Sequence, residues 1–235
     1  MARPVLALAA LLAAVPLAGC VAPFDGEDGP PEVALEADPP MVFAGGTVLL
    51  KASFPNGRPE GSRIEFDPGD GNLTTTEDAT LEYRYMVGGI HRARVTLLSQ
   101  DDEPLAEGEA DVTVNERGGL EGRVARSPFI DDHPDAVLAG RIPWTPAMEQ
   151  FRVHFSLVGT DPRETVVTVR ILADGRALVE EDVALGLQER QNVSFEGRFN
   201  EPPPHLIEVE AQRGSADVRV VVEMYYAAIE DEGDG

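Results

Sequence analysis

Hydrophobic and polar residues alternate in short runs between residues 32 and 116, without the helical period of about 3.6 residues. The run 90–97 shows the pattern best, with one face formed by His91, Ala93, Val95 and Leu97. Similar runs cover residues 33–37, 47–54, 63–66, 80–85 and 106–114, and turn-forming Pro, Gly and Asn lie between them. The pattern predicts an all-β domain whose strands have one buried and one solvated face.

A second series of alternating runs extends from Leu120 to about Tyr226. Phe151, Val153, Phe155 and Leu157 alternate with polar residues, and Asp174-Gly175 has the composition of a hairpin turn. The spacing predicts about seven or eight strands packed as two sheets. Its layout resembles the jelly-roll domains at the C-termini of secreted peptidases.

The two series predict a chain of two β-sandwiches, at residues 32–116 and 119–228. Residues 115–119 contain polar side chains and two glycines, and we expect the last strand of the first series to end before them. Residues 229–235 form an acidic tail that we expect to be disordered.

The first series carries a recognisable motif. Residues 66–71 read Phe-Asp-Pro-Gly-Asp-Gly, and 83–85 and 89–97 follow at characteristic distances. Together they resemble the PKD family, which typically reads aromatic-Asp-aromatic-Gly-Asp-Gly, then His-x-Tyr, then Gly-x-Tyr-x-Val-x-Leu. The chain departs from that pattern at Pro68, Tyr83 and His91. The resemblance implies an immunoglobulin-like sandwich that acts as a spacer or interaction module and has no catalytic residues.

Tyr85 precedes a Gly turn that leads into an alternating strand. This arrangement fits a tyrosine corner, in which the phenol hydroxyl bonds to upstream backbone.

The N-terminus has the features of an export signal. Arg3 precedes an apolar stretch, 6–17, which is too short to span a bilayer. Leu17-Ala18-Gly19-Cys20 resembles the processing site of bacterial and archaeal lipoproteins, in which the cysteine is lipidated and becomes the first residue. We therefore predict a signal peptide at 1–19, lipidation of Cys20, and an acidic Gly/Pro tether at 20–31. An ordinary cleaved signal with an incidental cysteine is the alternative.

The net charge of the chain limits the classes of molecule that it can bind. Nineteen Lys and Arg residues face forty-two Asp and Glu residues, which gives a net charge of −23. Nucleic acid is excluded, because its binding requires clustered cations. Only Lys51 among the basic residues is a lysine, a bias that resembles salt-adapted or high-GC archaeal proteins. Cys20 is the sole cysteine, so the sequence has neither a disulfide framework nor a thiolate metal site.

Two groups of residues are candidates for metal binding. Asp67 and Asp70 flank a Gly turn and could bind Ca²⁺, but the sequence favours an Asx-stabilised turn, because a Ca²⁺ site needs six or more oxygen ligands and no full loop signature is present. A second group of residues could hold a divalent metal or supply a general base; the alternative interpretation is that these residues form a solvated loop. It consists of Asp131, Asp132, His133 and Asp135. We expect no resident cofactor.

Asn72 and Asn192 lie in Asn-x-Ser/Thr sequons and are candidate glycosylation sites.

These features favour a non-catalytic, lipid-anchored protein at the outer face of the cell membrane. It would act as a spacer, adhesion or ligand-binding module, and its expected partners are the membrane, through Cys20, and a glycan or envelope protein. One alternative is an accessory subunit that docks on a membrane complex. Another is a metal-assisted hydrolase that uses His133 and the neighbouring aspartates.

Overall fold

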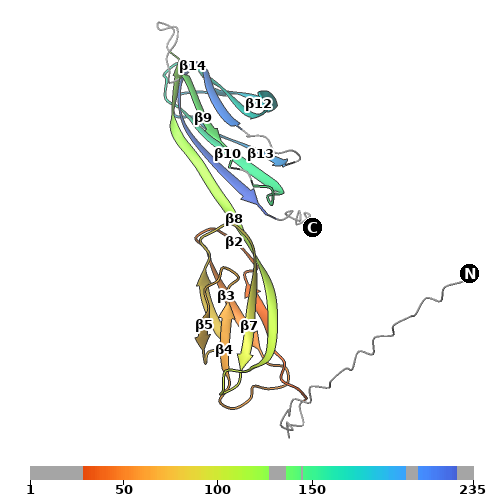
Figure 1. The fold of residues 1–235 in the computed structure, drawn as a ribbon. Helices are drawn as coiled ribbons and strands as arrows, with labels where there is room; N and C mark the ends of the chain where they lie inside the picture. The colour runs from red at the N-terminus through yellow and green to blue at the C-terminus, as the bar shows by residue number, and fades with distance from the viewer. Residues whose placement is uncertain (1–28, 127–135, 144, 200–205, 227–235) are drawn as a thin grey trace, which may run out of the picture. The chain divides into compact units, whose positions relative to one another are not determined.

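The computed structural model describes residues 29–126, 136–143, 145–199 and 206–226. The predicted signal peptide, Cys20, most of the tether, the Asp131–Asp135 group and the acidic tail lie outside these residues. The described chain is built from strands β1–β14, as Figure 1 shows. Within it, no helix has the length and apolar character needed to cross a membrane.

The first sandwich pairs a three-stranded sheet with a five-stranded one. In the smaller sheet, β3 (Thr47–Ser53) lies between β1 (Ala34–Asp38) and β6 (Thr80–Arg84). The larger sheet has the order β2-β8-β7-β4-β5, and its strands are β2 (Met41–Phe43), β8 (Pro104–Arg126), β7 (Gly89–Leu98), β4 (Arg63–Asp67) and β5 (Thr74–Thr76). Only the pairing of β2 with β8 is parallel among these contacts. The all-β sandwich expected from the alternation is confirmed, with the short strands β2 and β5 added.

The second sandwich is also made of two sheets. One has the order β12-β11-β14-β9, with β12 (Arg176–Leu185), β11 (Thr165–Ala173), β14 (Leu206–Tyr225) and β9 (Val137–Arg141). The other has the order β13-β10-β14-β8, with β13 (Arg190–Arg198) and β10 (Gln150–Gly159). Asp174 and Gly175 have φ of 49° and 72° and join β11 to β12, which confirms the predicted hairpin turn.

Strand β14 belongs to both sheets of the second sandwich. Residues 206–213 pair with β11, and residues 214–224 pair with β8. Gly214 lies at the change with φ of 72°, a conformation that glycine adopts without strain. The buried residues change from odd positions, such as Val209, to even positions, such as Val218. Each half of the strand therefore faces the same core from an opposite side.

The expected strand end before residues 115–119 is wrong. Strand β8 continues from Pro104 to Arg126, and its partner changes from β7 to β14 between Val114 and Glu116. Asn115 is buried, and its side-chain oxygen accepts a hydrogen bond from the Tyr226 amide at 3.2 Å. A Cβ on Gly119 would lie 2.4 Å from the Val220 carbonyl oxygen, so this glycine serves a close backbone approach. The limits of the two domains stay predictions.

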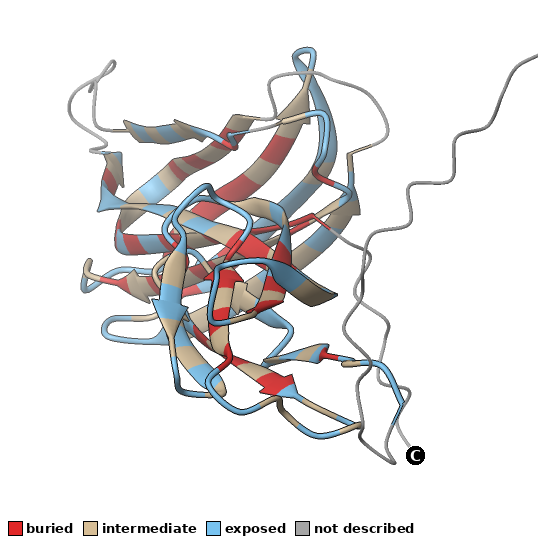
Figure 2. Ribbon diagram, turned by 60° about the horizontal axis from the view of Figure 1, so that its bottom comes forward, coloured by how far each residue is buried: buried red, intermediate tan, exposed pale blue. Residues whose placement is uncertain are grey.

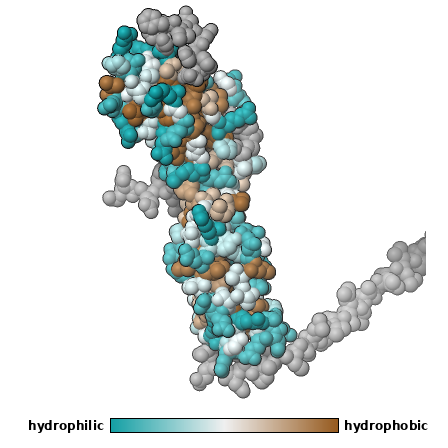
Figure 3. Space-filling model, turned by 90° about the vertical axis from the view of Figure 1, so that its left-hand side faces the viewer, coloured by the Kyte–Doolittle hydropathy of each residue, from teal (hydrophilic) through white to brown (hydrophobic). Residues whose placement is uncertain are grey.

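Two hydrophobic clusters form the cores. Phe66 and Tyr85 are buried in the first cluster, and Phe155 and Leu157 in the second. Buried and exposed positions alternate along the strands in Figure 2, while Figure 3 shows hydrophilic residues over much of the face in view. The Tyr85 hydroxyl donates to the Pro68 carbonyl at 3.0 Å, which confirms the tyrosine corner.

Candidate functional site

The carboxylates of Asp67 and Asp70 support the turn between β4 and β5. The Gly69 amide donates to Asp67 Oδ1 at 2.8 Å, and the Asn72 amide donates to Asp70 Oδ1 at 3.1 Å. The Tyr83 hydroxyl donates to the other Asp70 oxygen. These bonds confirm the interpretation of an Asx-stabilised turn. Across the described ranges, no three His, Cys, Asp or Glu side chains gather closely enough to hold a metal.

Asp70 makes the stability of the first sandwich depend on pH. Burial raises the pKa of Asp70, but hydrogen bonds from Tyr83 and Asn72 outweigh it and hold the pKa below the ordinary value of 3.8. Because the pKa of Asp70 is lower in the folded state, the ionised carboxylate stabilises the folded protein at neutral pH. This stabilisation is lost as pH falls through the folded-state pKa. We expect Asp70→Asn to cost about 1 kcal/mol at neutral pH, and the cost to shrink below about pH 4.

Thermal unfolding of the parent protein and of the Asp70→Asn variant, from neutral to acid pH, measures this cost. Asp101→Asn is the matched control, because the exposed Asp101 carboxylate makes no side-chain bond within the described chain. A cost of Asp70→Asn that stays constant at acid pH would contradict the role given to the carboxylate.

Both predicted glycosylation sites are exposed. Asn72 follows the turn, and its side-chain amide donates to the Tyr83 hydroxyl at 3.1 Å. Asn192 lies on β13 opposite Ser156 of β10. Glycosylation of either residue stays a prediction.

The two histidines in the described part of the chain each contact neighbouring residues of their own sandwich. His91 is half-buried against Tyr85, with ring centroids 5.0 Å apart, and its Nε2 lies 2.9 Å from the Val87 carbonyl oxygen. His154 is exposed on β10, with Nδ1 at 2.9 Å from Ser194 Oγ. His133 and its neighbouring aspartates lie outside the described residues.

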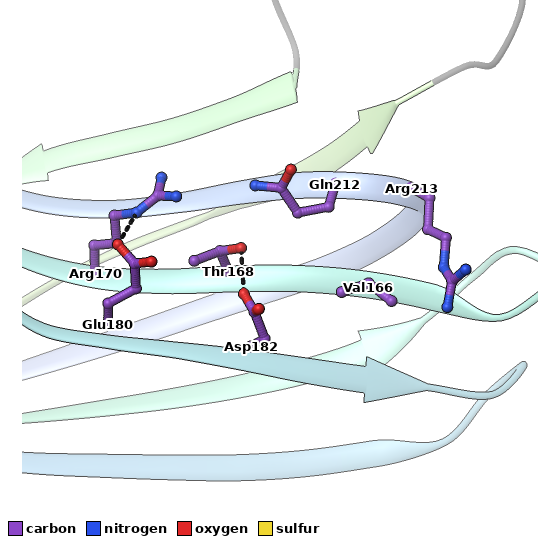
Figure 4. Close-up of a pocket in the computed structure, with 7 residues that line it drawn as sticks. All are labelled: Val166, Thr168, Arg170, Glu180, Asp182, Gln212 and Arg213. Atoms are coloured by element: carbon purple, nitrogen blue, oxygen red, sulfur yellow. Dashed lines mark hydrogen bonds and ion pairs between the residues drawn. The ribbon is translucent and has the colours of Figure 1, made fainter.

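An open pocket lies on the outer face of strands β12, β11 and β14 of the second sandwich (Figure 4). We call it the β11 pocket. It has a volume of about 490 Å³ and is lined by Val166, Thr168, Arg170, Glu180, Asp182, Gln212 and Arg213. Strand register brings these residues together, because Thr168 pairs with Asp182 and Arg170 pairs with Glu180.

Arg170 organises the floor of the β11 pocket. Its Nε lies 2.8 Å from Glu180, and its Nη1 lies 2.8 Å from Glu208 and 2.7 Å from Glu210. Hydrogen bonds to Glu210, Glu180 and Glu208 raise the pKa of Arg170 further above its ordinary value. The arginine side chain is only 20% exposed, so these bonds are partly shielded from water. The three acidic side chains are therefore fixed around one permanent cation.

The other polar groups divide into fixed and available ones. Thr168 is buried, and its hydroxyl donates to Asp182 Oδ1 at 2.6 Å. Arg213 is paired with Glu164 at the rim. Gln212 makes no side-chain hydrogen bond to any described residue and projects from β14 beside the pocket. Its amide can both donate to and accept from a ligand.

Sequence reasoning missed the β11 pocket. Its residues come from three strands that are distant in sequence, and they form no local motif. The available signal was the alternation of Thr168 and Arg170 with apolar residues at 167, 169 and 171, which marks the outward face of this strand.

Comparison with known proteins identifies similar strand arrangements. No protein-family model matches the chain, and no curated protein does. A carbohydrate-binding module of the β-sandwich superfamily aligns over 84% of this chain and 97% of its own, with 11% identity and a TM-score of 0.35. The PKD domain of an M14-like peptidase from Thermoplasmatales archaeon SCGC AB-540-F20 aligns over 37% of this chain and 97% of its own, with 18% identity and a TM-score of 0.29.

A SusE-like protein aligns over 82% of this chain and 97% of its own, with 12% identity and a TM-score of 0.25. These values are too low to carry a conclusion about ligand or activity. The strands of the chain itself define it as an all-β protein of sandwich-like sheets.

Proposed function

We propose that the protein is a non-catalytic binding protein, held at the outer face of the cell membrane by lipid on Cys20, and that it binds a neutral glycan in the β11 pocket. The export signal and the Leu-Ala-Gly-Cys sequence support the location. The observation that carries the binding role is a polar, charge-balanced pocket with an available amide at Gln212.

The chemistry of the pocket favours a neutral ligand rich in hydroxyl groups. Two arginines, Arg170 and Arg213, balance two acids, Glu180 and Asp182, so the lining has no net formal charge. Apolar drug-like ligands prefer enclosed and mostly hydrophobic cavities, whereas this pocket is open and lined mainly by polar groups. Sugar hydroxyls both donate and accept hydrogen bonds, as the Gln212 amide does.

The arrangement of the acids supports binding over catalysis. Glu180 is held by Arg170, and Asp182 accepts from Thr168. A general acid or base needs to reach the ligand with a transferable proton. Carboxylates that already serve these internal bonds are better suited to shaping a surface than to proton transfer.

Calorimetric titration of the detergent-purified full chain with neutral oligosaccharides tests the proposal. We expect saturable binding without change of the sugar, and a loss of about tenfold in affinity for Gln212→Ala, the value of one good hydrogen bond. Gln100→Ala, an exposed glutamine of the first sandwich, is the matched control and should bind as the parent does. Equal affinity of Gln212→Ala and parent, or no bound oligosaccharide, would overturn the assignment.

A further inference from the structure

The outer face of the sheet β13-β10-β14-β8 is rich in arginine, and we call it the arginine face. Strand register places six arginines and four carboxylates on it. The arginines are Arg117, Arg123, Arg152, Arg190, Arg198 and Arg219. The carboxylates are Glu121, Glu196, Asp217 and Glu223. The face therefore has a positive formal charge in a chain whose net charge is −23.

The other outer sheet faces have the opposite balance among their described residues. On the face of β12, β11, β14 and β9, the four acids at 180, 182, 208 and 210 exceed the three arginines at 141, 170 and 213. On the face of β4, β7 and β8, acids at 65, 67, 107, 109 and 111 exceed the arginines at 63, 92 and 94. On the face of β1, β3 and β6, acids at 36, 38 and 82 exceed Lys51 and Arg84.

Four of the six arginines on the arginine face form ion pairs with its carboxylates. Arg117 lies 2.5 Å from Glu223 and Arg123 lies 2.7 Å from Asp217. Arg152 lies 2.5 Å from Glu196, and Arg219 lies 3.7 Å from Glu121. Each carboxylate thus has an arginine partner. Within the described chain, the exposed Arg190 and Arg198 have no carboxylate partner.

A hollow of about 440 Å³ lies beside one of these free cations. It is lined by Glu121, Gly122, Ser156, Val158, Arg190, Asp217, Val218 and Arg219. Asp217 is engaged by Arg123, and the Arg219 side chain is 69% exposed with only the long contact to Glu121. Arg190, Arg219 and the Ser156 hydroxyl are therefore the groups that the hollow offers to a ligand.

We propose that this hollow is a second ligand site and that it binds a carboxylate-bearing sugar residue of an acidic glycan. Guanidinium groups match the planar carboxylate with paired hydrogen bonds. Charges beyond about 8 Å are screened at physiological ionic strength, so the local cations act on a bound group more strongly than the distant acids do. The site is independent of the β11 pocket, because it lies on the other sheet and uses none of the same residues.

The proposed site has a consequence for glycosylation of Asn192. Asn192 pairs with Ser156, which lines the hollow. A glycan attached to Asn192 would lie over the same face and block it. The proposal requires Asn192 to be unmodified in the mature protein, and full occupancy of Asn192 found by peptide mass spectrometry would overturn it.

Binding of the full chain to polygalacturonate, compared with the methyl-esterified polymer, tests the site directly. We expect binding of the acid form that weakens with added salt, and little binding of the ester. The double variant Arg190→Gln/Arg219→Gln should lose at least about tenfold in affinity, because two charge-assisted bonds are removed.

The control is Arg92→Gln/Arg94→Gln, which removes the same charge from exposed arginines of β7. It should bind as the parent does, and both double variants should keep the parent's melting temperature. Equal binding of acid and ester, no binding of the acid form, binding of dextran sulfate alone, or equal losses in both double variants would overturn the proposal. If Arg190→Gln/Arg219→Gln still binds neutral oligosaccharides in the β11 pocket, the proposed function holds independently of this second site.

Discussion

Gly214→Ala is expected to destabilise the second sandwich by about 3 kcal/mol, because the new methyl group would meet both strain and a clash. Gly214 has φ of 72° at the point where β14 passes from one sheet to the other. A Cβ there would lie 2.5 Å from Thr165 Oγ1 and 3.0 Å from Thr165 Cα. Chemical denaturation followed by circular dichroism measures the loss.

Gly175→Ala is the matched control for this prediction. Gly175 also has φ of 72°, but a Cβ at this position would have no atom within 4 Å. We expect a cost of about 1 kcal/mol, from backbone strain alone. Equal costs for the two substitutions would show that the close packing of Gly214 against Thr165 does not hold the bend of β14.

Arg170→Met is expected to destabilise the second sandwich by about 2 kcal/mol at neutral pH, because three acids would lose their shared cation. Methionine keeps much of the side-chain volume, so lost packing contributes little. Glu180, Glu208 and Glu210 would repel one another in the variant.

Arg63→Met provides the comparison for Arg170→Met. Arg63 is 41% exposed and, among the residues that the structure describes, is paired with a single acid, Asp102. Exposed pairs of this kind contribute at most about 1 kcal/mol. Melting curves of both variants and the parent at neutral pH distinguish the two positions. A change for Arg170→Met no larger than for Arg63→Met would mean that the three-acid cluster does not organise the β11 pocket.

Local patterns in the sequence were enough to predict the sandwich class and several of its details. The alternation at Phe151–Leu157 matches the buried and half-buried positions of β10. The Asp174-Gly175 turn and the tyrosine corner at Tyr85 depend on neighbouring residues or on a single recurring motif, so they could be inferred without knowing the fold.

Features that depend on distant strands could not be inferred in this way. Gly118 and Gly119 indicate a break by local rules, yet β8 continues because β14 supplies a new partner from about a hundred residues later in the chain. The β11 pocket and the arginine face arise from register between separate strands. Charged residues that look like an ordinary solvated surface in sequence become organised sites only when the strands pair.

The proposed role depends first on display at the cell surface, and the intact mass of the full-length protein extracted from its host membrane tests this most directly. We predict a mature chain that begins at Cys20 and carries the added mass of a lipid, with Cys20→Ala released from the membrane fraction. A chain that begins elsewhere, or one that begins at Cys20 without added lipid mass, would contradict the account.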